Sequence, residues 1–237
     1  QQEKLIINER HEAWGNLARK LAHEIKNPLT PIQLTIDRIK EKYSKKVDTN
    51  EKDNFEDNLK IINNQIKQIE NLVNEFSDFA RMPKPIFKEN NLVKIIKDNI
   101  QLLSQIDKTI KFNFISNKTD ILLGSDKEQM NRVIFNLIKN SIESIQQKAE
   151  NSSDFEKIIT IEIFEKDNQI SIIIIDSGLG FGIFKNNVNE ILNPYVTTKK
   201  NGTGLGLSIV NKIINDHNGK LNFISIQDGA KVKIIFN

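Results

Sequence analysis

The chain has 237 residues and no cysteine, and its 34 Lys and Arg against 31 Asp and Glu leave a formal net charge of +3. This length fits one large domain or two small ones, and the near balance of interspersed charges indicates no contact with nucleic acid. The missing cysteine excludes disulfides, thiolate metal sites and a cysteine nucleophile. Because no apolar run approaches the roughly 18 residues of a membrane span, we expect no membrane contact from these residues.

Two apolar stripes near the start of the chain predict a pair of long helices. From Ala22 onward, apolar residues recur at alternating steps of three and four, which places them on one helix face. The members of this stripe are Ala22, Ile25, Leu29, Ile32, Ile36, Ile39 and Tyr43. The polar residues 44–54 predict a loop, and a stripe of the same spacing runs from Phe55 to Ala80. Two long helices joined by a short loop form an antiparallel hairpin.

This hairpin predicts a homodimer, because a single pair of helices cannot cover its own apolar stripe. Two copies that associate through residues 1–82 would form a four-helix bundle. A plain coiled-coil spacer is the alternative, and periodicity alone favours it. Pro83 and Pro85 then break helical hydrogen bonding, so residues 83–87 are predicted to form an extended linker.

Residues 88–237 have the pattern of an α/β sandwich. The predicted helices are 92–103, 126–149 and about 205–216. The predicted strands are 110–115, 121–123, 158–165, 169–175, 220–226 and 231–236. We expect Asp126 to cap the second helix, Gly219 to terminate the third, and Asp228-Gly229 to form the turn of the last hairpin.

An exposed histidine stands out on the first helix. His23 and Glu24 fall outside the apolar stripe and face water, so a core histidine is disfavoured. An exposed histidine without a function is the alternative, and from position alone it is the commoner case. Pro28 favours a functional histidine. It removes the backbone N–H that would donate to the Glu24 carbonyl, and a proline inside an ordinary helix costs about 3 kcal/mol. The loss of a helical hydrogen bond beside an exposed imidazole indicates a site at which the helix must bend.

The neighbours of this histidine supply the groups that a nucleophile needs. Glu24 can hold one ring nitrogen of His23 as N–H and leave the other as a lone-pair nucleophile. Asn27 lies one turn on and on the same face, where its amide can position a water molecule.

Three further segments point to a nucleotide. Asp176 lies at the end of a predicted strand and is followed by Gly178 and Gly180. Its carboxylate can accept a hydrogen bond from an exocyclic amine. The two glycines let the backbone approach a flat ring closely. The segment Gly202–Leu207 precedes a helix, where backbone N–H groups cradle phosphates. It matches neither a Walker A loop nor a dinucleotide turn. Taken singly, an Asp-Gly turn and a flexible loop remain the alternatives.

The third of these segments is a pair of asparagines. Asn136 and Asn140 are four residues apart on one face of a predicted helix, and their amide oxygens suit Mg²⁺ that is held partly by phosphates. In an Asn-rich chain this pair means little alone. The argument depends on all three segments occurring in order, with His23-Glu24 upstream.

At this point the sequence resembles the transmitter region of bacterial sensor histidine kinases, and it is most similar to the NtrY-type kinases of nitrogen regulation. Five motifs carry the resemblance in the family's order. The H box, N box, G1 box, F-box region and G2 box correspond to His23–Pro31, Arg132–Ser144, Asp176–Gly180, Pro194–Lys199 and Gly202–Leu207. The resemblance implies an α+β chain, in which a dimerising phosphotransfer hairpin (1–82) precedes a Bergerat (GHKL) ATP-binding domain (88–237).

The resemblance also implies the site residues. His23 would be the phosphoacceptor, Glu24 its base, and Asn27 the residue that positions water in a phosphatase reaction. Asn140 would hold Mg²⁺ with Asn136 nearby, Asp176 would bind the adenine amine, and residues 180–206 would include a mobile lid. The implied ATP-binding set is Asn136, Lys139, Asn140, Asp176, Gly178, Gly180, Thr198, Lys199, Gly202, Thr203, Gly204, Leu205 and Gly206.

The implied reaction is autophosphorylation of His23 from ATP and Mg²⁺, followed by transfer to an aspartate of a response regulator that is NtrX-like by resemblance. Asn136 stands where gyrase-like relatives carry a water-activating glutamate, which disfavours ATP hydrolysis. A nucleotide-gated binding scaffold and a Ser/Thr kinase of the anti-sigma-factor type are the competing hypotheses, and the second would not need the H box.

The sequence departs from the family's motifs at few positions. Ser141 replaces the frequent alanine, Leu192-Asn193 replace Phe-Glu, and residues 181–189 lack the frequent proline. Because the chain starts at Gln1 with helix-like residues, we expect a piece of a longer protein, the cytoplasmic portion of an inner-membrane sensor.

Overall fold

The chain forms two compact units in a computed structural model. The first unit comprises Gln1–Pro83 with Lys199–Thr203, and the second comprises Lys84–Thr198 with Gly204–Asn237. The side chains of 2–17, 79, 188 and 189 are not described. The structure describes residues 2–48, 50–80, 82–152, 154–182, 188–193, 196–197, 199 and 202–237.

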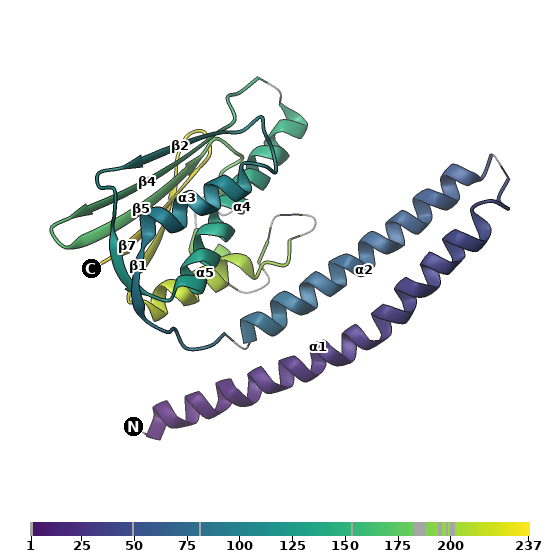
Figure 1. The fold of residues 1–237 in the computed structure, drawn as a ribbon, viewed down its shortest axis with the longest axis horizontal. Coiled ribbons are helices and arrows are strands. Elements are labelled where there is room, and N and C mark those ends of the chain that lie inside the picture. Colours follow the sequence, from purple (N-terminus) through teal and green to yellow (C-terminus); the bar gives the residue numbers. More distant parts are fainter. Residues whose placement is uncertain are drawn as a thin grey trace. The chain divides into compact units, whose positions relative to one another are not determined.

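The first unit contains the predicted helical hairpin. Helix α1 (Gln2–Tyr43) and helix α2 (Lys52–Ala80) run side by side and are joined by a short connection, as Figure 1 shows. The hairpin core consists of Ile36, Leu59 and Ile66. Half-buried partners surround it, namely Leu29, Ile39 and Phe55.

The packing of this hairpin covers only part of each apolar stripe. Ile25, Ile32, Ile62 and Ile69 are between 42% and 46% exposed, although they belong to the same stripes as the buried residues. The reason is geometric, because one neighbouring helix contacts a narrower arc than a stripe with a step of three and four occupies. We call these four residues the exposed isoleucine row.

Two prolines lie inside α1 without ending it. The helix is continuous from Gln2 to Tyr43 through Pro28 and Pro31. Each proline removes one backbone donor, and the carbonyls left without that donor belong to Glu24 and Asn27. Both of these residues are exposed, so water can bond the free carbonyls. The two prolines therefore cost α1 backbone hydrogen bonds without interrupting the helix.

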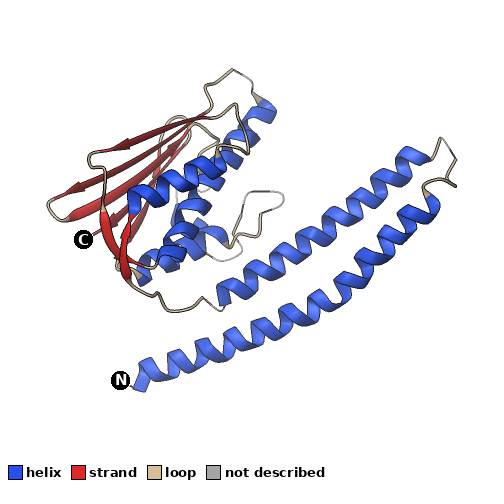
Figure 2. Ribbon diagram, viewed as in Figure 1, coloured by secondary structure: helices blue, strands red, loops and turns tan. Residues whose placement is uncertain are grey.

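The second unit is a two-layer α/β sandwich (Figure 2), as predicted. The sheet has the order β2 (Lys111–Ser116), β4 (Ile158–Lys166), β5 (Gln169–Asp176), β7 (Ala230–Phe236) and β6 (Lys220–Ser225). Strands β2 and β4 are parallel, and the other neighbours are antiparallel. One face of the sheet is covered by α3 (Leu92–Leu103), α4 (Lys127–Asn151) and α5 (Gly206–Asp216), as in Figure 1.

Isoleucine dominates the layer between sheet and helices. Burial alternates along β4 and β5 with the period of two that a half-buried strand requires. The side chains of this layer that are at most 2% exposed include Ile159, Ile161, Ile163, Ile172, Ile174, Ile134, Ile138, Ile142 and Ile145. The second unit therefore has a closed core of its own.

Two short elements were not predicted. Strand β1 (Lys88–Asn91) pairs antiparallel with β3 (Leu122–Ser125), and a 3-10 turn, η2, spans Val188–Leu192. The sequence of β1 is Lys-Glu-Asn-Asn, which has no strand periodicity. It becomes a strand because its backbone pairs with β3.

The end of α5 corrects one prediction. The residue in the left-handed conformation is Asn218, with φ 56°, whereas Gly219 was expected to end the helix. Gly219 is required for a different reason, since a Cβ there would lie 2.8 Å from the Phe236 ring. Its N–H still donates to the carbonyl of Ile214 at 2.9 Å.

Candidate active site

The predicted histidine motif lies on the solvent-facing side of α1. His23, Glu24 and Asn27 are all exposed, as the heptad pattern predicted. Since α1 is unbroken, His23 and Asn27 stand one turn apart on the same side of the helix. This arrangement presents an imidazole to solvent with a carboxylate and an amide beside it.

In the second unit, the centre of the candidate nucleotide site is Asp176 at the end of β5. Its side chain is buried, and both carboxylate oxygens are bonded: the Ser141 hydroxyl donates to Oδ2 at 3.1 Å and the Gly178 N–H donates to Oδ1 at 2.9 Å. Burial raises the pKa of Asp176, and the hydrogen bonds from Gly178 and Ser141 oppose that rise. The carboxylate is thereby held in one orientation, with lone pairs left for a ligand amine.

The loop after Asp176 is fastened to α4. The Leu179 N–H donates to Ser144 Oγ at 2.9 Å, and Lys148 Nζ donates to the carbonyl of Ser177 at 2.9 Å. A Cβ at Gly178 would lie 2.2 Å from Ser144 Oγ. Only glycine therefore fits between this loop and α4.

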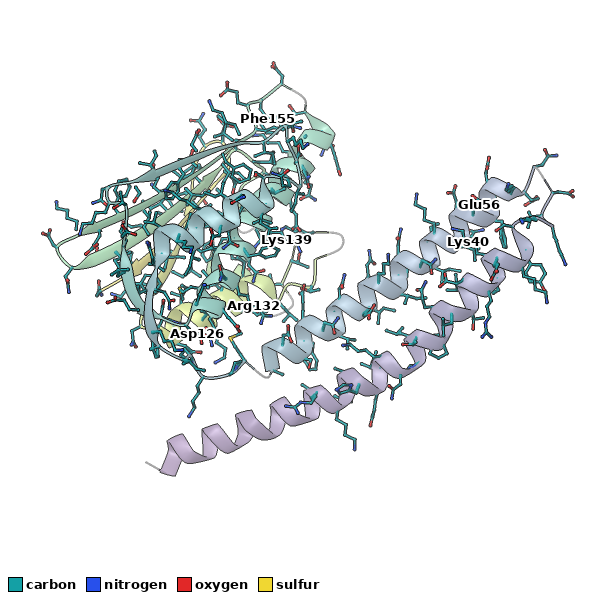
Figure 3. All side chains as sticks on the ribbon, viewed as in Figure 1. Lys40, Glu56, Asp126, Arg132, Lys139 and Phe155 are labelled. Atoms are coloured by element: carbon teal, nitrogen blue, oxygen red, sulfur yellow. The ribbon has the colours of Figure 1, made fainter. Side chains whose placement is uncertain are left out.

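Helix α4 carries the predicted amide pair. Asn136 and Asn140 are half-buried, and Lys139 is exposed with its Nζ 3.8 Å from Glu143 Oε1. Asp126, Arg132 and Lys139 are labelled in succession along α4 in Figure 3. Neutral amide oxygens that are partly accessible suit Mg²⁺ shared with phosphate oxygens, so the donor chemistry of the pair fits that ion.

The glycine-rich loop leads directly into α5. Gly202, Thr203 and Gly204 are half-buried, and Gly204 has φ 70°, which favours glycine. Leu205 is fully buried and its carbonyl accepts the Ile209 N–H at 2.9 Å, which ties the loop to the start of the helix. The helix begins at Gly206, so its free N–H groups and dipole are available to an anion.

Within the second unit the structure brings together parts of all three predicted segments, whereas Gly202 and Thr203 belong to the first unit. Helix α4 packs against both β5 and α5, so the amide pair, Asp176 and the start of α5 belong to one assembly. Lys199 is half-buried. Thr198 and the Pro194-Tyr195 part of the F-box region lie outside the described residues. The histidine motif belongs to the other unit.

Sequence reasoning noted Ser141 only as a change from alanine and did not find Ser144 or Lys148. The available signal was polar side chains at steps of three and four on a helix face otherwise made of isoleucine. The turn at Gly229 was predicted, but its contact was not: a Cβ there would lie 1.7 Å from the Asp176 carbonyl oxygen, and φ is 112°. This turn packs against the end of β5.

Comparison with known families agrees with this geometry. Residues 125–237 match the model described as "Histidine kinase-, DNA gyrase B-, and HSP90-like ATPase". Residues 13–85 match the "His Kinase A (phospho-acceptor) domain". The fold and the candidate site thus define a phosphoacceptor domain followed by an ATPase domain.

The relatives place the chain among the sensor histidine kinases, and it belongs to that family. An NtrY-like sensor histidine kinase of Rickettsia felis is 38% identical over 238 residues, which are 100% of this chain and 38% of the relative. The nitrogen regulation protein NtrY of Azorhizobium caulinodans is 34% identical over 95% of this chain and 29% of its own length. The chain thus spans well under half of these relatives.

A solved structure extends the likeness across both units. It is the histidine kinase ThkA in complex with the response regulator protein TrrA, with 26% identity and a TM-score of 0.66 over 99% of this chain and 65% of that one. In the part of our chain that the structure describes, no helix has the length and apolarity needed to cross a membrane.

Proposed function

We propose that this chain phosphorylates its own His23 from ATP and passes the phosphoryl group to an aspartate on the receiver domain of a response regulator. The observation that carries the proposal is the buried Asp176 carboxylate, which Ser141 and Gly178 hold in place. A fixed acceptor at the end of a strand, beside a glycine backbone, suits the exocyclic amine of adenine. The exposed His23, in a segment that matches a phosphoacceptor domain, supplies the nucleophile.

Residues of three segments are proposed to bind ATP and Mg²⁺. Asp176 accepts from the adenine amine, and the backbone from Gly202 to Gly206 binds phosphate oxygens at the start of α5. Asn140 would hold Mg²⁺ with Asn136 beside it, and the bound ion would neutralise charge on the phosphates. Lys139, Thr198 and Lys199 are proposed as further phosphate contacts.

The transfer itself needs a neutral imidazole. A His23 ring nitrogen attacks the γ-phosphorus, the bond from phosphorus to the ADP oxygen breaks, and Glu24 takes the proton from the other nitrogen. In the second transfer, a receiver carboxylate oxygen attacks phosphorus, the phosphorus–nitrogen bond breaks, and the imidazole takes its proton back from Glu24. Asn136 cannot act as a general base, so water competes poorly for the γ-phosphoryl group. Asn27 would position water when the chain dephosphorylates its regulator.

The exposed isoleucine row supports a homodimer through residues 1–82. Four isoleucines that are more than 40% exposed lie on the stripes that face the partner helix. A second copy that covers them would complete a four-helix bundle, and each fully buried isoleucine contributes about 1.5–3 kcal/mol. The cytoplasmic side of an inner-membrane sensor and an NtrX-like regulator are the proposed setting and partner, by likeness to the NtrY proteins.

The test is labelling with ATP that carries radioactive γ-phosphate. We expect the wild type to gain a label that acid removes and base preserves, and we expect His23→Gln to gain none. Glu41→Gln is the control, because Glu41 is an exposed carboxylate of α1 outside the histidine motif. Equal acid-labile labelling of His23→Gln would contradict the proposal. ATP binding without any label would favour the nucleotide-gated scaffold.

A further inference from the structure

Four residues of the second unit form a cluster where the predicted linker meets the start of α4 and the end of α5. None of them has a role in the proposed reaction. Asp126 precedes α4, His217 follows α5, and Ile86 and Phe87 end the predicted linker. The Ile86 N–H donates to Asp126 Oδ2 at 2.8 Å, and the ring of Phe87 lies 5.0 Å from the ring of His217, centroid to centroid. We call these four residues the linker clasp.

His217 has a defined tautomer in this clasp. Its Nε2 accepts the backbone N–H of Asp126 at 3.0 Å, and its Nδ1 lies 2.8 Å from the carbonyl oxygen of Ile213. A carbonyl can only accept, so Nδ1 carries the hydrogen and Nε2 keeps its lone pair. The imidazole is buried, and both of its nitrogens have hydrogen-bond partners. Such an arrangement binds α5 to the start of α4.

Asp126 does two things at once. One carboxylate oxygen accepts the Gln129 N–H at 3.0 Å and caps α4, while the other accepts the linker amide. Burial alone would raise the pKa of Asp126, but the hydrogen bonds from Ile86, Gln129 and Glu128 outweigh it and hold the pKa below its usual value. The carboxylate is therefore ionised at neutral pH, and its bond to the linker is charge-assisted.

The clasp holds the end of the predicted linker against the second unit. Ile86 and Phe87 are 68% and 52% exposed, so little apolar burial holds them. Strand β1 follows at Lys88. Of the linker predicted at residues 83–87, Ile86 and Phe87 therefore contact the second unit.

We propose that the linker clasp is a positioning element for autophosphorylation, because it fixes the point from which the second unit is tethered to the hairpin. This inference rests on the proposed function. Each residue adds up to about 3.6 Å of reach, so release of Ile86 and Phe87 lengthens the tether by up to about 7 Å. Effective concentration falls roughly as the −3/2 power of tether length, and orientation is lost as well.

The test measures autophosphorylation of the full chain at saturating ATP beside ATP affinity. Phe87→Ala removes the ring contact without touching either helix cap, and His217→Leu removes the acceptor for the Asp126 N–H. Both variants should lower the phosphorylation rate by about two- to tenfold with an unchanged Kd for ATP. His217→Gln should restore part of the rate, because its amide oxygen can accept where Nε2 does.

Asp107→Ala is the matched control. Asp107 also has a lowered pKa and accepts the Thr109 N–H at 2.9 Å, but it does not touch the linker. An unchanged or faster rate in Phe87→Ala would overturn the inference. A wild type that binds ATP but gains no label would instead overturn the proposed function.

A nuclear magnetic resonance measurement tests the clasp without any catalysis. We expect the His217 imidazole to be the Nδ1–H tautomer and the Ile86 amide to exchange slowly with solvent. In Asp126→Asn the Ile86 amide should exchange faster. An Ile86 amide that exchanges in the wild type at the rate of an unprotected residue would contradict the clasp directly.

Discussion

Isoleucine plays opposite parts in the two units. On α4, Ile134, Ile138, Ile142 and Ile145 are at most 2% exposed, whereas the exposed isoleucine row of the hairpin is 42% to 46% exposed. The second unit can bury its apolar face because a sheet lies against it. Among the described residues of the first unit, the hairpin core lies between α1 and α2 alone. The same residue type thus completes a core in one region and leaves a surface for a second copy in the other.

The sharpest test of this comparison is a matched pair of truncations. Ile138→Ala should destabilise the second unit by about 2–5 kcal/mol at every protein concentration, because it opens a cavity in a closed core. Ile62→Ala should weaken the hairpin mainly through association, so its effect should depend on protein concentration. Thermal unfolding at several concentrations measures both. A concentration-independent effect of Ile62→Ala would break the comparison.

A second prediction concerns Asp176, which lies in the second unit at the end of β5. Asp176→Asn should lower ATP affinity by about 10- to 100-fold, since a hydrogen bond to a charged acceptor is worth about 1.5–3 kcal/mol. Isothermal titration measures the affinity, and sedimentation should show unchanged dimerisation. Full ATP affinity in this variant would remove Asp176 from the site.

Replacing Ser141, which contacts Asp176, should lower ATP affinity less than replacing Asp176 itself. Ser141→Ala removes the hydroxyl that donates to Asp176 Oδ2 at 3.1 Å, so ATP affinity should fall by about two- to tenfold. The pKa of Asp176 should also rise further, because one hydrogen bond that opposes burial is gone. ATP titrations between pH 5 and pH 8 would therefore show a larger pH dependence in the variant. Identical pH profiles would show that Ser141 does not act through Asp176.

The smallest expected effect is the acid dependence that Asp126 contributes. Its folded-state pKa lies below the unfolded value of about 3.9. The stability from this group is therefore fully present above pH 4 to 5 and is lost as the pH falls through the lower, folded pKa. Asp126→Asn should flatten that part of the profile, as measured by urea midpoints from pH 2 to pH 6. An unchanged acid profile would contradict the charge-assisted capping of α4.

Local patterns predicted much of the molecule. The bounds of α3, Leu92–Leu103, agree with the prediction, because its apolar spacing is strong and Asn91 caps it by accepting from the N–H groups of Val93 and Lys94. The cap at Asp126 was also predicted from the residue type alone. Strand β1 was missed, because its pairing partner lies beyond α3 and β2 in the chain.

The candidate site was predicted as types of residue and not as contacts. Asn136, Asn140 and Asp176 were expected from motif and spacing, and α4 and β5 now hold them in one assembly. The hydroxyl that orients Asp176 was missed, because Ser141 is 35 residues away in the chain. No periodicity within a helix shows which strand end the helix will contact.

The amino-acid sequence by itself determined the helix faces, the turn residues and the chemical groups, because these depend on neighbours within one or two turns. Tertiary structure decided which isoleucines are covered, why Gly219 has no side chain, and what Ile86 and Phe87 contact. The clasp shows the reason most plainly: Asp126 joins Ile86, 40 residues before it, to His217, 91 residues after it. Contacts at such separations depend on how the layers pack.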